Sequence, residues 1–219
     1  MIGKATRRVR LAHRAVALVA LSAIALAAGA CGAQAPTPTP STEPGRASFT
    51  IPPNGDGFKL VILKKTWDQA LQNKYTWADA WAVLETISLD DPVEAVGDGQ
   101  IESYDWTNQT VTLTRAASEA FAPTFASSAP SGQLVAQTLF VVTLNGARLY
   151  GGMFLSEQSA MGIKFPVIYL AGDSEHLELA IRPSHSGISG YSDIEASLRA
   201  RIEIPQVRAH FEQLGKLTQ

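Results

Sequence analysis

The sequence predicts an α+β domain in which an antiparallel β-meander carries helices packed on one of its faces. Three features predict this class: hairpin turn signals between apolar runs, strands of alternating polarity in the second half, and amphipathic helical segments around them. We expect a single domain at residues 57–219, preceded by a signal peptide at 1–30 and a tether at 31–56.

The predicted domain begins with a short apolar run at 58–63, which is typical of a buried or edge strand. Residues 67–75 then have the spacing of one helical face. Thr76 is a good N-cap for a second helix, in which Trp77 and Trp81 recur at helical spacing. The first strand is therefore followed by two helices.

A hairpin is expected next, because residues 100–107 lead into a turn at 107–109, after which Val111 and Leu113 alternate with threonines. The Asp90-Asp91-Pro92 tripeptide ends the preceding helix. A short helix is predicted around 116–121, and a loop rich in Ala, Ser and Pro at 122–132.

Four further strands are predicted between residues 134 and 182. The first pair flanks Asn145-Gly146, the dipeptide that best accepts the two positive φ angles of a type I′ turn, and the second pair flanks Gly172-Asp173. Pro166 must lie at an edge or before its strand begins, and Gly151-Gly152 indicates a bulge or a close backbone approach. The strands are expected at 135–144, 147–155, 165–170 and 177–181.

Two helices are expected to close the chain. Ser192 is a good N-cap for the first, and acidic residues follow it in the first helical turn. Pro205 can open the second helix, which is predicted to end at Gly215.

The N-terminus has the organisation of an export signal. Residues 1–14 contain five basic and no acidic side chains, and an apolar run at 15–30 follows them. That run is shorter than the roughly 20 residues needed to span a bilayer, so a signal peptide is favoured over a membrane helix. Cys31 comes directly after the run and is followed by a tract rich in Pro and Thr.

On these residues the N-terminus resembles bacterial lipoproteins, in which a cysteine becomes the new N-terminus and is acylated. The resemblance covers about the first 45 residues. It implies lipidation of Cys31, anchoring to a membrane, and location on a periplasmic or extracellular face. Ala28-Gly29-Ala30 stands where the usual lipobox begins with Leu, Val or Ile, and it also suits ordinary signal peptidase. Both cleavage routes remain open.

The acidic residues of the mature chain are concentrated in one segment. Without residues 1–30, 13 basic and 20 acidic residues remain, for a net charge of -7. Residues 75–114 contain eight acidic residues and no Lys or Arg, whereas the rest of the mature chain is almost neutral. This charge excludes a basic nucleic-acid binder, and it could attract a cationic partner.

Two candidate sites lie in this acidic segment, and each has a simpler explanation beside it. Carboxylates could hold calcium, although their spacing does not match an EF-hand loop and a solvated face is the leading explanation for them. Tryptophans near carboxylates could bind an envelope glycan, although helical spacing also suits a core position. The calcium candidates are Asp90, Asp91, Glu94 and Asp98. The ligand candidates are Trp77, Trp81, Trp106, Glu102 and Asp105.

The histidines offer weaker candidates. His176 could ligate a metal at the tip of its hairpin, beside Asp173 and Glu175, or it could lie in solvent. His185 stands between two serines, as a base beside a nucleophile would, but neighbours in sequence rarely face each other. His210 is expected on the surface of the last helix.

The motif search favours a binding protein over an enzyme. The sequence contains no nucleophile elbow, phosphate loop, dinucleotide fingerprint or His-Glu-x-x-His motif. We therefore expect a non-catalytic, surface-tethered module that binds a ligand or partner of the cell envelope. Two alternatives remain: a hydrolase of envelope polymers that uses Glu102 and Asp105 as paired carboxylates, and a purely structural or assembly lipoprotein.

Overall fold

The computed structural model describes residues 55–126, 137–185 and 192–218. These residues belong to one compact unit, and they form a nine-stranded mixed sheet with five helices. The strands are β1 (Phe58–Thr66), β2 (Pro92–Gly97), β3 (Ile101–Asp105), β4 (Thr110–Leu113), β5 (Thr138–Leu144), β6 (Ala147–Phe154), β7 (Val167–Gly172), β8 (Leu177–Arg182) and β9 (Leu217–Thr218). The helices are α1 (Trp67–Ala70), α2 (Trp77–Leu84), α3 (Arg115–Ala126), α4 (Ser192–Ile202) and α5 (Pro205–Gln213). The predicted α+β class is confirmed.

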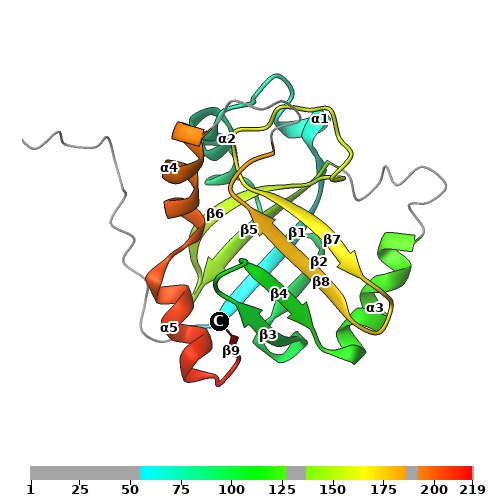
Figure 1. Ribbon diagram of the computed structural model, residues 1–219. Helices are drawn as coiled ribbons and strands as arrows, with labels where there is room; N and C mark the ends of the chain where they lie inside the picture. Colours follow the sequence, from blue (N-terminus) through cyan, green and yellow to red (C-terminus); the bar gives the residue numbers. More distant parts are fainter. Residues whose placement is uncertain (1–54, 127–136, 186–191, 219) are drawn as a thin grey trace, which may run out of the picture. The chain divides into compact units, whose positions relative to one another are not determined.

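The sheet curls back on itself. Its strand order is β2-β1-β5-β6-β7-β8-β4-β3-β9, so β2 and β3 lie toward opposite ends. Yet only the 3₁₀ turn η1 (Asp98–Gln100) separates β2 from β3 along the chain. The two ends of the sheet must therefore approach each other, and the strands surround a common interior (Figure 1).

Each face of the sheet has its own apolar core, because side chains alternate between faces along a strand. The inner core includes Phe58 and Phe140, together with Phe211 of α5. The outer core includes Val61 and Val141, and α1 and α2 cover it. The prediction that helices pack on one face is therefore wrong, since the helices are divided between the two sides (Figure 1).

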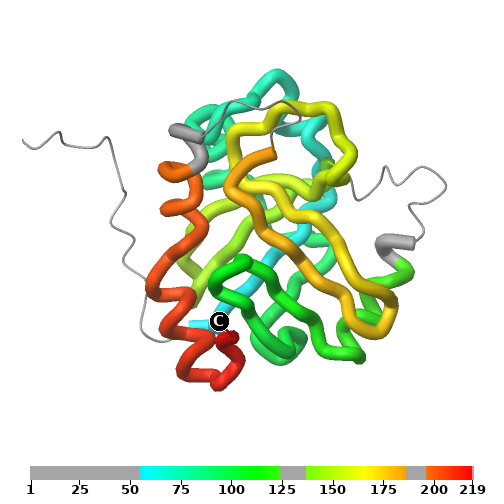
Figure 2. Tube along the Cα trace, in the orientation of Figure 1, coloured from blue at the N-terminus to red at the C-terminus, as the bar shows by residue number. Residues whose placement is uncertain are grey.

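The predicted antiparallel meander is also wrong. The strands β5, β6, β7 and β8 are neighbours in the predicted order, but β6 and β7 run parallel. The physical reason is the connection at 155–166, which is about as long as a parallel crossover requires and carries the chain back before β7 starts. β9 also pairs in parallel with β3, and Figure 2 shows the end of the chain beside the β3–β4 region.

Glycine and proline occupy the positions that the sequence predicts for them. Asn145 and Gly146 have φ angles of 50° and 83°, which confirms the predicted tight turn between β5 and β6. A Cβ atom at Gly152 would lie 1.8 Å from the carbonyl oxygen of Pro166, which confirms the close backbone approach. β7 begins at Val167, directly after this proline, so its missing N–H lies outside the strand.

The predicted and observed elements also differ at 67–75 and at 92–97, where the local sequence patterns are weak. The segment at 67–75 forms only the single helical turn α1, whereas Thr76 caps α2 by accepting a hydrogen bond from the backbone N–H of Asp79, 3.3 Å. β2 was not predicted, because Pro92 at its start suggests only the end of a helix. β2 pairs with one strand alone, so a proline at its first residue is tolerated.

Candidate functional site

The carboxylates predicted to bind calcium do not converge in the structure. Asp90 accepts a hydrogen bond from the Ser88 hydroxyl at 2.8 Å, and Asp91 pairs with Lys64 at 2.5 Å. Glu94 is half-buried on β2. Among the described residues, no group of three or more His, Cys, Asp or Glu side chains could hold a metal ion. Local contacts therefore explain these residues better than a shared cation does.

Asp98, the fourth calcium candidate, ties the corner between β2 and β3 to the end of the chain. Its Oδ1 accepts hydrogen bonds from Nε2 of His210, at 2.9 Å, and from the backbone N–H of Phe58, at 3.3 Å. The Lys216 ammonium donates to the carbonyl oxygens of Asp98 and Ile101, at 2.5 and 2.6 Å. These contacts hold the curled sheet against α5, which is a structural role.

Two of the candidate tryptophans form a stack on α2. The rings of Trp77 and Trp81 lie 5.3 Å apart at an interplanar angle of 9°, and the guanidinium of Arg201 lies 5.0 Å from the Trp77 ring centre. Both indoles are half-buried and pack against the apolar cores. Much of their ring surface therefore contacts other residues of the domain and is not open to a ligand, as their helical spacing predicts.

Trp106 lies in a different part of the domain. It follows β3, makes an edge contact with Tyr104 at 6.0 Å, and has Arg208 of α5 5.9 Å from its ring centre. Figure 1 shows α2 and β3 at opposite ends of the domain. The structure therefore does not bring Trp77 and Trp81 together with Trp106 in one platform.

The two carboxylates proposed for hydrolysis have separate surroundings. Oδ1 and Oδ2 of Asp105 accept hydrogen bonds from the backbone N–H and side-chain amide of Asn108, both at 2.8 Å. These bonds hold the pKa of Asp105 below its ordinary value, whereas a general acid needs a raised pKa. Glu102 is exposed on β3. Asp105 thus shapes the turn between β3 and β4.

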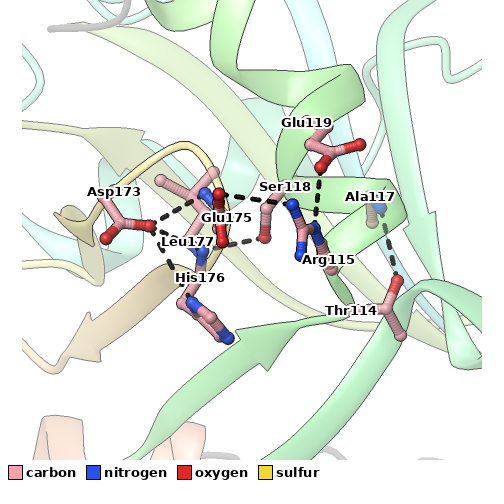
Figure 3. Close-up of polar contacts among 9 residues, drawn as sticks. All are labelled: Thr114, Arg115, Ala117, Ser118, Glu119, Asp173, Glu175, His176 and Leu177. Atoms are coloured by element: carbon pink, nitrogen blue, oxygen red, sulfur yellow. Dashed lines mark hydrogen bonds and ion pairs between the residues drawn. The ribbon is translucent and has the colours of Figure 1, made fainter.

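The tip of the β7–β8 hairpin, predicted as a weak metal site, is also organised as a turn (Figure 3). Oδ1 of Asp173 accepts hydrogen bonds from the backbone N–H groups of Glu175 and His176, at 2.8 and 2.9 Å. The same bonds lower the pKa of the Asp173 carboxyl. This aspartate therefore caps its own turn, and its oxygen is not directed to a cation.

Helix α3 fixes this tip from the side (Figure 3). Arg115 pairs with Glu119 at 2.9 Å and with Glu175 at 3.3 Å. The buried hydroxyl of Ser118 accepts a hydrogen bond from the backbone N–H of Leu177 at 2.9 Å. Paired charges and a buried hydrogen bond thus account for the polar groups drawn in Figure 3.

His185 is buried, and both of its ring nitrogens are engaged. Nδ1 lies in a short hydrogen bond with the Tyr169 hydroxyl, and Nε2 lies 2.8 Å from the carbonyl oxygen of Ser159. A carbonyl only accepts, so Nε2 carries the proton and Nδ1 accepts from the phenol. Burial raises the pKa of Tyr169 to about 12, which keeps the phenol a donor. His185 therefore fastens the 155–166 connection instead of activating a serine.

A small cleft of about 160 Å³ is a candidate for a binding site. Residues 107–109 of the β3–β4 turn line one side, and residues 181–183 at the end of β8 line another. Arg199 and Ile202 of α4 complete the lining. Three segments that are far apart in the sequence therefore meet at this site.

Of the described residues that line the cleft, two are charged, and both are arginines. Nη1 of Arg182 donates to the carbonyl oxygens of Asn108, at 2.7 Å, and Ile181, at 3.0 Å. Nη1 of Arg199 pairs with Glu203 at 3.1 Å. Neither arginine was predicted from the sequence, because the two come from separate elements and follow no spacing pattern. The alternation of β8 places Arg182 at the end of a strand, but nothing local indicates a cleft there.

Comparison with protein-family models, curated proteins and solved structures finds no match for this chain. No helix in the described parts of the chain is long and apolar enough to cross a membrane. Cys31, the predicted lipidation site, lies outside the described residues.

Proposed function

We propose that this chain is an exported, lipid-anchored protein of the cell envelope whose folded domain binds a ligand or partner without catalysing a reaction. The observation that carries the proposal is the order of features at the N-terminus: five basic residues, the apolar run 15–30, and then Cys31. The cysteine is the single one in the chain. Acylation would remove a thiol that is otherwise exposed to an oxidising compartment.

The segment after Cys31 suits a tether. Pro36, Pro38, Pro40 and Pro44 favour an extended polyproline-like backbone. At about 3.1 Å per residue, residues 31–56 would reach on the order of 80 Å. This reach would hold the domain clear of the lipid surface and let its binding site meet ligands in the envelope.

The geometry of the domain supports binding better than hydrolysis. Asp105, one of the paired carboxylates that hydrolysis would need, is committed to a turn and has a lowered pKa. The arginine-lined cleft offers fixed hydrogen-bond donors instead. The acidic segment 75–114 adds a surface for an envelope glycan or a cationic partner.

The anchor is tested by expressing the full chain in a bacterial host with labelled palmitate. We expect the wild-type chain to take up the label and to fractionate with membranes. Cys31→Ala should lose the label and leave the membrane fraction, whereas Ser41→Ala in the tether should behave as wild type. An unlabelled, released wild-type chain would instead show cleavage by ordinary signal peptidase and would overturn the anchor.

A further inference from the structure

We infer that the cleft lined by Arg182 and Arg199 binds a phosphate-type oxyanion, either free or as part of a larger molecule. The inference rests on the binding role proposed above and names its site and ligand chemistry. It does not depend on the lipid anchor. Charge, the orientation of the donors, and the size of the cleft each support it.

The charge of the cleft opposes that of the protein around it. Within the described part of the chain, Arg182 and Arg199 are the ionisable residues in its lining, and Glu203, the ion-pair partner of Arg199, is not among the lining residues. The mature chain carries a net charge of -7, so its overall field repels anions. An anion that binds here must therefore be held by local contacts with the two guanidinium groups.

The structure holds the Arg182 guanidinium in place before any ligand arrives. Its Nη1 donates to two carbonyl oxygens, one on β8 and one in the β3–β4 turn. A guanidinium has five N–H donors, so these two contacts leave other donors of the planar group for a ligand. Preorganised donors lose less conformational entropy on binding, which favours affinity.

Arg199 reaches the cleft from α4, a different element from Arg182. Its contact with Glu203 uses Nη1 alone, and its side chain is 47% exposed. A planar carboxylate can satisfy both of its oxygens with one guanidinium. A tetrahedral oxyanion has more oxygens, in several directions, and can contact two guanidinium groups at once. Two arginines from separate elements therefore favour phosphate over carboxylate.

The size of the cleft limits the ligand to a small group. Its volume is about 160 Å³, against about 300–1,000 Å³ for sites that hold drug-sized ligands. One water molecule in liquid occupies about 30 Å³. A phosphate group fits such a space together with a few waters, whereas a glycan chain or a folded peptide does not.

The turn that forms one wall is itself fixed. The buried Gln109 accepts a hydrogen bond from the Tyr104 hydroxyl at 2.5 Å and donates to the carbonyl oxygen of Trp106 at 2.7 Å. The amide of Gln109 thus sets the path of residues 107–109. These buried hydrogen bonds can keep the carbonyl oxygen of Asn108 in position to accept from Arg182 and orient its guanidinium.

Isothermal titration calorimetry on the detergent-purified mature chain, at low ionic strength, tests the inference with inorganic phosphate as the probe. We expect saturable binding, weakened about tenfold or more by Arg199→Gln, because charged hydrogen bonds are lost. Arg182→Lys should also weaken binding, since it keeps the charge but loses the planar group of donors. Circular dichroism of each variant confirms that it is folded.

Arg208→Gln is the matched control, because Arg208 is exposed on α5 and does not line the cleft. It should leave the affinity for phosphate within about twofold of wild type, because removing an exposed charge outside the cleft has only a screened, long-range effect. An equal loss with Arg208→Gln would overturn the site in favour of nonspecific attraction. No phosphate binding by wild type, or unchanged binding by Arg199→Gln, would also overturn it.

Glycerol 3-phosphate and acetate identify the ligand class. Binding of glycerol 3-phosphate at least as tight as that of phosphate would support a phosphate ester as the natural ligand, and tighter inorganic phosphate would support the free ion. Acetate that binds as tightly as either would overturn the preference for a tetrahedral anion. None of these results depends on acylation of Cys31, so failure here is separate from failure of the anchor.

Discussion

The turns of two hairpins, β3–β4 and β7–β8, are each capped by an aspartate, but the two turns differ in whether a nearby arginine can bind an anion. In each, an aspartate caps the turn through backbone N–H groups or an amide, and its pKa is lowered by those hydrogen bonds. The aspartates are Asp105 in the first hairpin and Asp173 in the second. Their carboxylates are therefore occupied by the turn itself.

The arginines near the two ends have different partners. At the β7–β8 end, Arg115 lies between the carboxylates of Glu119 and Glu175, so its charge is neutralised (Figure 3). At the β3–β4 end, Arg182 contacts backbone carbonyls, which orient a guanidinium without cancelling its charge. Arg199, which lines the same cleft, pairs with one carboxylate, Glu203, so the uncancelled charge there is that of Arg182. The comparison indicates that the β3–β4 end, and not the β7–β8 end, is equipped to bind an anion.

The largest effect is expected for Gln109→Ala at the β3–β4 end. The substitution leaves the buried Tyr104 hydroxyl and the Trp106 carbonyl without their partner. The free energy of unfolding should fall by about 2–4 kcal/mol, because two hydrogen bonds to buried groups are lost. Urea denaturation followed by tryptophan fluorescence measures the change. A loss below about 0.5 kcal/mol would contradict the role given to Gln109.

Tyr150→Phe is the matched control for Tyr104→Phe, which removes the hydroxyl that donates to Gln109. The Tyr150 hydroxyl is buried and has no hydrogen-bond partner within the described residues, unlike that of Tyr104. Removing it should leave the free energy of unfolding unchanged or raise it by about 1 kcal/mol, because no hydrogen bond is lost. Tyr104→Phe should instead lower it.

Ser118→Ala should have the next largest effect, at the β7–β8 end. Its hydroxyl accepts the hydrogen bond of the buried Leu177 N–H, so the substitution leaves that N–H without this partner. We expect a loss of about 1–3 kcal/mol in the free energy of unfolding. Amide hydrogen exchange should speed up at Leu177 and its neighbours. Unchanged exchange at Leu177 would show that α3 does not hold this tip.

Arg115→Gln should have a smaller effect. It breaks two ion pairs, but the side chain of Arg115 is 64% exposed, and exposed pairs contribute about 0–1 kcal/mol. We expect phosphate binding at the cleft to be unchanged, because Arg115 does not line it. Titration calorimetry and thermal unfolding measure both outcomes. Phosphate binding that depends on Arg115 would remove the distinction between the two hairpin ends.

The smallest effects are expected from the two capping aspartates at low pH. The folded pKa of each is lowered, so each contributes stability that is present above its ordinary pKa, 3.8, and is lost as pH falls through the folded pKa. Asp105→Asn and Asp173→Asn should each flatten the dependence of unfolding free energy on pH below about 4. Urea denaturation between about pH 5 and 2 measures this dependence. A slope as steep as wild type in both variants would contradict the capping role.

Local chemistry made much of the fold predictable. Asn145-Gly146, Thr76 and Pro205 act through their own backbone preferences, so the turn and the two helix starts followed from short segments. The parallel pairing of β6 and β7 did not, because it depends on where the 155–166 connection packs. β2 was missed because its pairing with β1 outweighs a proline at its first residue.

The candidate site was less predictable, for a related reason. Acidic residues cluster between 75 and 114 in the sequence, but hydrogen bonds within turns and ion pairs engage Asp91, Asp98 and Asp105 individually. The two arginines of the cleft, Arg182 and Arg199, follow no pattern in the sequence, and only the fold brings α4 and the end of β8 to the same cleft. A charge count along the chain therefore indicated the acidic segment and gave no sign of the cleft.

The intact mass of the mature protein from native membranes tests the central claim, a binding domain on a lipid anchor, most directly. We expect a chain that begins at Cys31 and carries a diacylglyceryl group, with or without a further acyl chain on its new N-terminus. A mature chain whose Cys31 thiol is unmodified would contradict it.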